Sequence, residues 1–399
     1  MQERGKTPNR EEGFVTDERN DDWDPRSDAV VADQRAAYDE MRETCPVAHS
    51  EFLGWSVFRH EDAVAIATDP ERFSSATRRL AVPNGMDPPM HTQHRDALSS
   101  AFGPDRMASF EPVARRIATD LLTPIQARGA METIGEFANP FAHQAVCAFM
   151  GWPVEDWNRV AEWTHGNQEA AFRRDREAGA TLAREFDTYV TEIIDARRAD
   201  PAADDVMTEL VNTSVDGELL SNERIVSALR TWTAGHGTVA GALGIVIAHL
   251  ANDATLQQRL REEPILIDPA IGEILRSDGP LVSNNRTATR DVEIGGRSIA
   301  AGERLSLIWI AANRDPSTFE DPGSVDLRRP AEESVLFGTG IHRCLGEPLA
   351  RLELRTAVAE LLRNLDMIEA TSDRPPRHVY PSNGLAALPI SFTARSAAW

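Results

Sequence analysis

The stretch SVLFGTGIHRCLGEPLARLELRTAVAELL, residues 334–362, is the most informative part of the chain. Gly338 and Gly340 allow sharp turns in a loop, Cys344 follows, and Gly346 opens an amphipathic helix. A thiolate at a helix N-terminus is stabilised by the helix dipole and by free backbone N–H groups, which lower the pKa of the thiol. We therefore expect Cys344 to bind a metal ion, although a lone cysteine is usually an inert buried residue.

A second unusual stretch, TWTAGHGTVAGALG (residues 231–244), lies inside a long apolar helix that the periodicity predicts for residues 221–252, with Ser221 as its N-cap. Each of its four glycines costs about 1 kcal/mol relative to alanine in a helix. Something must therefore approach this backbone closely. The segment is long and apolar enough to cross a bilayer, but its glycines, threonines and histidines favour a buried central helix.

Composition narrows the classes of partner. The chain has 399 residues, 41% of them hydrophobic, and a net charge of −21 from 42 basic and 63 acidic residues. Such an excess of negative charge argues against nucleic acid and against an anionic membrane surface as partners. Cys45, Cys147 and Cys344 show no C-x-x-C spacing, which argues against a disulfide framework or a zinc site. The first residues are charged and lack an apolar core, so we expect no signal peptide and a cytoplasmic protein.

The predicted architecture is mainly α-helical with small β-sheets. No linker divides the chain, so we expect a mobile arm over residues 1–25 and one domain over residues 26–399. Strands are expected in LGWSVFR (53–59), as two or three strands within residues 286–310, and as a last hairpin within residues 383–393. Helices are expected at residues 105–126, 132–150, 155–171, 176–198, 221–252, 255–262, 267–277 and 346–364.

The pattern Phe337-Gly338-x-Gly340-x-His342-x-Cys344-x-Gly346 resembles the haem-binding signature of the cytochromes P450, the haem-thiolate monooxygenases, and most closely that of the soluble bacterial members. The resemblance runs from about residue 55 to residue 392. It implies the cytochrome P450 fold, with haem b between the long central helix and the cysteine loop. It also implies that Cys344 is the ligand of the haem iron, with Phe337 and Gly338 beside it.

The same resemblance assigns further haem contacts. DPPMHTQHRDALSSAF (87–102) resembles the family's helix that carries a histidine and an arginine to the haem propionates, here His91 and Arg95. Arg286 and His342 are expected to bind the same groups as charge-assisted donors. EILR (273–276) supplies Glu273 and Arg276, which form a buried structural ion pair in the family. Ser324 stands where many relatives have an arginine that joins this pair.

The central helix departs from the family pattern at one position. The family usually has Ala-Gly-x-acid-Thr here, so Ala234 and Thr238 are expected together above the iron, and Gly237 stands in place of the acid that serves proton delivery. Three explanations stay open. Another group such as His236 or ordered water relays protons, the substrate supplies the polar group, or the enzyme uses hydrogen peroxide. His236 itself is more simply a structural histidine.

Substrate contacts are expected by position in the family, at Phe172, Arg230, Val282, Ser283 and Leu385. The resemblance implies a monooxygenase that inserts one oxygen atom into a small hydrophobic or aromatic substrate, by hydroxylation or O-demethylation. The chain has no flavin or NAD motif, so a separate ferredoxin or flavodoxin-type protein is expected to supply electrons, with Arg343 among the residues that dock it. A peroxide-driven peroxygenase and a non-catalytic haem-binding scaffold are the alternatives.

Overall fold

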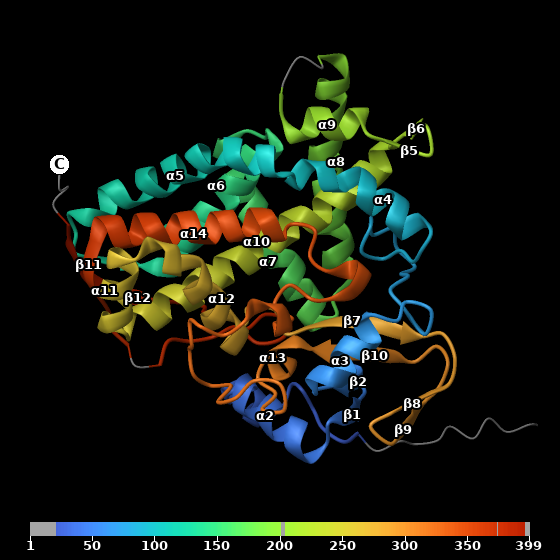
Figure 1. The fold of residues 1–399 in the computed structure, drawn as a ribbon. Helices are drawn as coiled ribbons and strands as arrows, with labels where there is room; N and C mark the ends of the chain where they lie inside the picture. Colours follow the sequence, from blue (N-terminus) through green and yellow to red (C-terminus); the bar gives the residue numbers. More distant parts are fainter. Residues whose placement is uncertain (1–20, 201–203, 373, 396–399) are drawn as a thin grey trace, which may run out of the picture.

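The computed structural model describes residues 21–200, 204–372 and 374–395. Helices form most of it, and the five-stranded sheet lies to one side together with α2, α3 and α13 (Figure 1). The helices are α1 Asp28–Ala32, α2 Gln34–Thr44, α3 His60–Ala67, α4 Met90–Ser99, α5 Pro104–Gln126, α6 Asn139–Met150, α7 Trp157–Arg173, α8 Arg176–Ala199, α9 Val206–Asn212, α10 Asn222–Ala251, α11 Ala254–Glu262, α12 Ile267–Ser277, α13 Trp309–Ala312 and α14 Glu347–Asn364.

The largest sheet has the strand order β1-β2-β10-β7-β3, and its register pairs Leu305 with Trp55 and with Arg286. A three-stranded sheet has the order β11-β12-β4, and two separate hairpins are formed by β5 with β6 and by β8 with β9. The strands are β1 Val47–Ser50, β2 Gly54–Val57, β3 Phe73–Ser74, β4 Ala130–Glu132, β5 Ser214–Val215, β6 Glu218–Leu219, β7 Ser283–Ala288, β8 Val292–Ile294, β9 Arg297–Ile299, β10 Arg304–Ile308, β11 Leu365–Ala370 and β12 Pro389–Ala394.

Helix α10 is the centre of the helical part and packs against α6, α7, α12 and α14. The Ser221 hydroxyl accepts a hydrogen bond from the N–H of Arg224, which confirms the predicted N-cap. Within the described residues this is the one helix long and apolar enough to cross a membrane, and 61% of its most apolar window is buried inside the protein. Most of the apolar window of this helix is therefore removed from water by packing inside the protein.

The helices predicted from periodicity are confirmed, and one of them differs at its start. The segment predicted as one helix over 132–150 begins as strand β4, passes through a π-helical segment, Ile134–Ala138, and continues as α6. The hairpin expected within 383–393 is wrong. Only β12 forms there, and it pairs with β11 and β4, because the strand that completes its sheet comes from residues 365–370. The two or three strands expected within residues 286–310 are wrong in number, because four strands occur there: the end of β7, the separate hairpin of β8 and β9, and β10.

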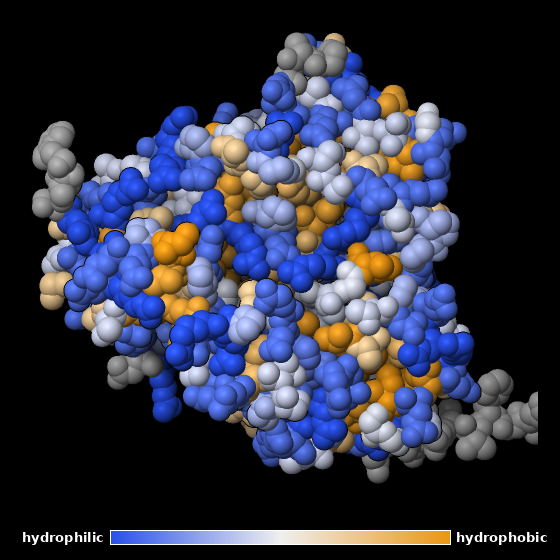
Figure 2. Space-filling model, viewed as in Figure 1, coloured by the Kyte–Doolittle hydropathy of each residue, from blue (hydrophilic) through white to orange (hydrophobic). Residues whose placement is uncertain are grey.

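The visible surface is dominated by hydrophilic residues, with separate apolar patches between them (Figure 2). This agrees with the net charge of −21. Charged side chains at such a density keep a protein soluble through mutual repulsion between molecules.

The packed part of the chain begins before the expected boundary at residue 26. Residues 1–20 of the predicted arm lie outside the described residues. Trp23 is buried, and its ring lies 5.3 Å from the ring of Phe58 and 6.0 Å from that of Tyr38. The N–H of Asp22 donates to the carbonyl oxygen of His49 at 2.9 Å. Trp23 therefore belongs to the core around the sheet, and the exposed Asp22 is bound to the strand β1 beside it.

We expect Trp23→Ala to lower the free energy of unfolding by about 3 kcal/mol, because a buried indole is lost and a cavity remains. Urea unfolding followed by circular dichroism measures this change. Val31→Ala is the control, because Val31 is 46% exposed and its truncation should change the free energy by about 0.5 kcal/mol or less. Equal effects of the two substitutions would show that the packing of Trp23 contributes nothing.

Candidate active site

The cysteine loop precedes α14 and is held by backbone hydrogen bonds. The N–H of Cys344 donates to the carbonyl oxygen of Phe337 at 2.8 Å, and the N–H of Gly338 donates to that of Val335 at 2.9 Å. Gly340 has a positive φ of +70°, and a Cβ there would lie 2.4 Å from the carbonyl oxygen of Ala67. Only glycine fits this position.

The environment of the Cys344 thiol differs from the expectation. Burial raises the pKa of the thiol, and this outweighs the hydrogen bond from the Gly346 N–H and the charges of Arg95 and Arg343, which lower it. Part of Cys344 is nevertheless exposed, and this residue lines a cavity. A metal ion bound to the sulfur would reverse the shift, because a coordinating thiol loses its proton.

A buried charge network lies beside the loop. Arg276, which is 1% exposed, donates to both carboxylate oxygens of Glu273 at 2.9 Å. The network has a third member that the sequence analysis missed, since Arg329 donates to Glu273 at 2.7 Å. The arginine expected at position 324 is therefore supplied five residues later. Ser324 contributes only its carbonyl oxygen, which accepts from Arg276 at 3.1 Å.

A cavity of about 310 Å³ lies between α10, the cysteine loop and the start of α14. Helix α10 faces it with residues spaced by one helical turn, namely Thr231, Gly235, Thr238, Val239 and Ala242. Thr238 thus lines the same cavity as Cys344. Its small neighbour on this face is Gly235, where a Cβ would meet no protein atom within 4 Å. Ala234 does not line the cavity in the described structure.

A cluster of cationic and imidazole side chains lies beside the cavity. The rings of His91 and His342 are 4.3 Å apart, and none of their ring nitrogens has a hydrogen-bond partner in the described structure. Arg286 is buried and forms no ion pair within the described residues. Its guanidinium donates to the carbonyl oxygen of Asn285 at 2.8 Å. Arg95 donates to the carbonyl oxygen of Arg343 at 2.6 Å. Burial, His91 and Arg286 lower the pKa of His342 to about 3. This cluster of donors can bind an anion.

Comparison with known proteins identifies the family. Residues 156–393 match the family model described as Cytochrome P450. The chain belongs to the cytochrome P450 family. It is 30% identical over 89% of its length to Cytochrome P450 109 of Bacillus spizizenii (91% of that protein), and 31% identical over 88% to Cyclomarin C epoxidase CymV of Salinispora arenicola (94%). The solved structure of CYP109E1 from Bacillus megaterium in complex with testosterone superposes with a TM-score of 0.80, at 27% identity, over 92% of this chain and 99% of that one.

Members of this family are haem-dependent monooxygenases, so the protein is an oxidoreductase that uses haem b. The residues present fit that group. The unpartnered nitrogens of His91 and His342, together with Arg286, match the negative charge of the propionates. The Cys344 sulfur on the same cavity is the ligand type of a haem-thiolate protein.

The structure brings most of the predicted haem contacts to one place and leaves the predicted substrate contacts elsewhere. Cys344, Phe337, Gly338, Arg286 and His342 line the cavity. The five expected substrate contacts do not line it in the described structure. Arg230 instead forms an ion pair with Asp187 of α8. Val282 and Leu385 are buried in apolar clusters and Phe172 is partly exposed. Ser283 is buried, and its hydroxyl has no hydrogen-bond partner in the described structure.

Two cavity residues that the sequence analysis did not assign are Gly235 and Glu353. Gly235 is found by counting from Thr238 and Thr231, because spacings of three and four residues put all three on one helix face. Glu353 stands between two buried leucines of α14 and is itself fully buried. A carboxylate inside an apolar helix segment is the signal that would have pointed to it.

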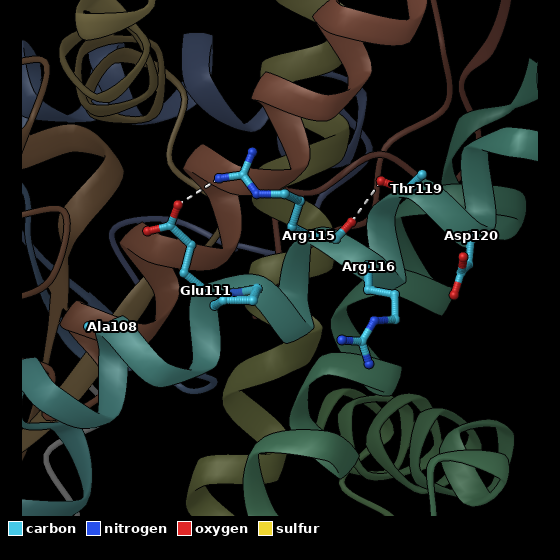
Figure 3. Close-up of a pocket in the computed structure, with 7 residues that line it drawn as sticks. Ala108, Glu111, Arg115, Arg116, Thr119 and Asp120 are labelled. Atoms are coloured by element: carbon cyan, nitrogen blue, oxygen red, sulfur yellow. Dashed lines mark hydrogen bonds and ion pairs between the residues drawn. The ribbon is translucent and has the colours of Figure 1, made fainter.

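A second hollow lies along α5, and two of its charged side chains, Glu111 and Arg115, form an ion pair (Figure 3). Arg115 donates to Glu111 at 2.7 Å and to Glu360 of α14 at 2.9 Å. The Arg115 side chain therefore links α5 to α14.

We expect Arg276→Met to lower the free energy of unfolding by about 3–5 kcal/mol, because the buried carboxylate of Glu273 then keeps Arg329 as its only cationic partner among the described residues. Urea unfolding measures it, and haem content should fall with it because the cysteine loop depends on the network. Arg328→Met is the matched control, since the Arg328 side chain is 88% exposed and pairs only with Asp326. A loss no larger than that of the control would contradict the role of the network.

Proposed function

We propose that this cytochrome P450 inserts one oxygen atom from dioxygen into a small hydrophobic organic substrate, aromatic ethers included, by hydroxylation or O-demethylation. The observation that carries the proposal is the common cavity of Cys344 and Thr238, which come from two different elements. The names of two similar proteins mention different compounds, testosterone and cyclomarin C, and so do not point to one substrate class. The proposed substrate class therefore rests on the mainly apolar lining of the cavity.

The roles of the residues follow from their chemistry. Cys344 would hold the iron, and the haem would supply the activation of dioxygen, which a thiolate ligand would favour. His91, Arg95, Arg286 and His342 would bind the propionates and so fix the orientation of the group. The Thr238 hydroxyl would donate a hydrogen bond within the cavity, and Gly235 leaves the space beside it free.

Electrons are proposed to come from a separate ferredoxin or flavodoxin-type protein, in the cytoplasm. The exposed side of the cysteine loop supports docking there, although Arg343 already pairs with Glu347 at 2.7 Å. A docking partner would therefore have to compete with that ion pair. A peroxide-driven reaction is the second candidate, and Gly237 favours it because the chain lacks an acid at this position.

Anisole tests the proposal. With a ferredoxin, its reductase, NADH and dioxygen, anisole should give one phenol, one formaldehyde and one water per two electrons and two protons consumed. Phenol formed with hydrogen peroxide alone, and none with the electron-transfer proteins, would favour the peroxygenase. Testosterone is the comparison substrate, because its larger size should exclude it if the substrate is small.

Cys344→Ser is expected to abolish this turnover and the red-shifted Soret band of the ferrous carbon monoxide complex, because an alkoxide replaces the thiolate donor. Absorption spectroscopy of the reduced, carbon monoxide-treated protein measures the band. Cys45→Ser is the control, since Cys45 lies outside the cavity and should leave the band unchanged. A retained red-shifted band in Cys344→Ser would show that another residue holds the iron.

The absence of a side chain at residue 237 has a packing cause. A Cβ there would lie 2.8 Å from Thr164 Cγ2 and 2.9 Å from Gln168 Nε2, both on α7. Helices α7 and α10 thus approach so closely that any larger side chain must displace a neighbour. In this structure the polar amide of Gln168 occupies the space that an acid at position 237 would need.

We expect Gly237→Ala to lower the free energy of unfolding by about 1–3 kcal/mol, because overpacking outweighs the higher helix propensity of alanine. Gly272→Ala in α12 is the matched control, where a Cβ would meet no atom within 4 Å. There the same change should raise stability by about 0.5–1 kcal/mol. Thermal or urea unfolding decides, and stabilisation at both positions would contradict the packing argument.

A further inference from the structure

The side chain of Asn284 is held at the wall of the cavity by a buried indole. Asn284 and Arg286 both line the cavity, and the alternation of side chains along β7 puts them on one face of this strand. Nε1 of Trp309, which also lines the cavity, donates to Oδ1 of Asn284 at 2.8 Å. Because Trp309 is buried, its ring cannot turn away to solvent, and the amide is held in one place.

The bond from Trp309 decides which end of the Asn284 amide is free. An indole N–H can only donate, so it must face the amide oxygen, and the NH₂ group is left on the other side. Turning the amide over would set two donors against each other. Within the described residues, Nδ2 of Asn284 donates no hydrogen bond. The adjacent Asn285 differs, because it accepts from the Ser306 hydroxyl at 2.9 Å and does not line the cavity.

The charged groups of this region leave no cation for a substrate carboxylate. Haem b carries two carboxylates, which match in number Arg95 and Arg286, the two arginines that form no ion pair within the described residues. His342 is assigned to the same two carboxylates. His236 has its own partner, since its Nε2 lies 3.2 Å from Oε1 of Glu353. A negatively charged substrate would therefore bring an unbalanced charge into a mainly apolar cavity.

We infer that the NH₂ group of Asn284 donates to an uncharged oxygen of the substrate, such as a carbonyl or ether oxygen. The inference rests on the proposed function and narrows its substrate class to small neutral molecules with such an oxygen. Asn284 is then a specificity-determining residue, and Trp309 is its positioning residue. A hydrocarbon that displaces water from the amide leaves the N–H groups without an acceptor, which lowers its affinity.

Two probes of the same shape test the inference in the ferric holoenzyme. Acetophenone has a carbonyl oxygen where α-methylstyrene has a CH₂ group. Asn284→Leu should weaken the binding of acetophenone about three- to tenfold, the value of one neutral hydrogen bond, and should not weaken that of α-methylstyrene. Titration of the Soret absorption measures both dissociation constants. Benzoate should bind the native protein at least about tenfold more weakly than acetophenone, because its charge has no partner.

Asn285→Leu is the matched control, since it makes the same change at the next residue of β7 and outside the cavity. It should leave all three dissociation constants unchanged. Infrared spectroscopy gives a second readout. The C=O stretch of bound acetophenone should lie at a lower wavenumber in the native protein and in Asn285→Leu than in Asn284→Leu. Should Asn284→Leu not fold, Asn284→Asp keeps an acceptor for Trp309 but replaces the NH₂ group, and the same selective loss is expected.

The outcomes separate this inference from the proposed function. Equal losses for the two probes, or the same C=O stretch with and without the amide, would show that Asn284 only shapes the wall. Unchanged affinities together with faster loss of haem to apomyoglobin would assign the amide to a propionate and overturn the inference. A native protein that does not bind acetophenone would overturn it too. If the probes behave as expected but the native protein oxidises no substrate with dioxygen and its electron donors, the proposed function fails and the assignment of the amide stands.

Discussion

The position of Cys344 depends on the buried guanidinium of Arg276. Arg276 donates to the carbonyl oxygen of Asn313 at 2.6 Å, and the side-chain oxygen of Asn313 accepts from the N–H of Val335 at 2.9 Å. The carbonyl oxygen of Val335 then accepts from Gly338, and that of Phe337 from Cys344. Hydrogen bonds joined by short covalent steps therefore connect α12 to the cysteine loop. Since a buried arginine is stable only when fully paired, the loop and the network stabilise each other.

The sequence predicts the parts of the fold whose burial pattern is local. The long helices, α10 among them, follow from apolar residues at spacings of three and four. Strand β12 was misassigned because a strand's partner is set by contacts distant in sequence, and β11 follows a long helix without a turn signal of its own. The helices α2, α3 and α9 were not predicted. Side chains cap the start of α2 (Asp33) and of α9 (Asp205), whereas α3 has no side-chain cap.

The site shows the same division. Cys344, Arg286, His342 and Thr238 belong to a motif or to a fixed spacing, and the cavity contains all four. Arg329 could not be assigned from spacing, because the loop that carries it has no periodicity to count. The substrate contacts were transferred by position alone. Arg230 was already neutralised by Asp187, a residue on another helix that no local pattern connects to it.

The glycines of α10 serve two different neighbours. Gly235 faces the cavity, whereas Gly237 faces α7 and Gly244 meets Ile134. The helical cost of these residues is thus divided between room for the cofactor and close packing of helices. Close packing against α7 leaves no room for an acidic side chain at position 237 of α10. The buried carboxylate of Glu353 lies on α14 instead. Burying an ion pair generally gains no stability over apolar residues of the same volume. Stability alone therefore does not account for the His236–Glu353 pair at the wall of the cavity.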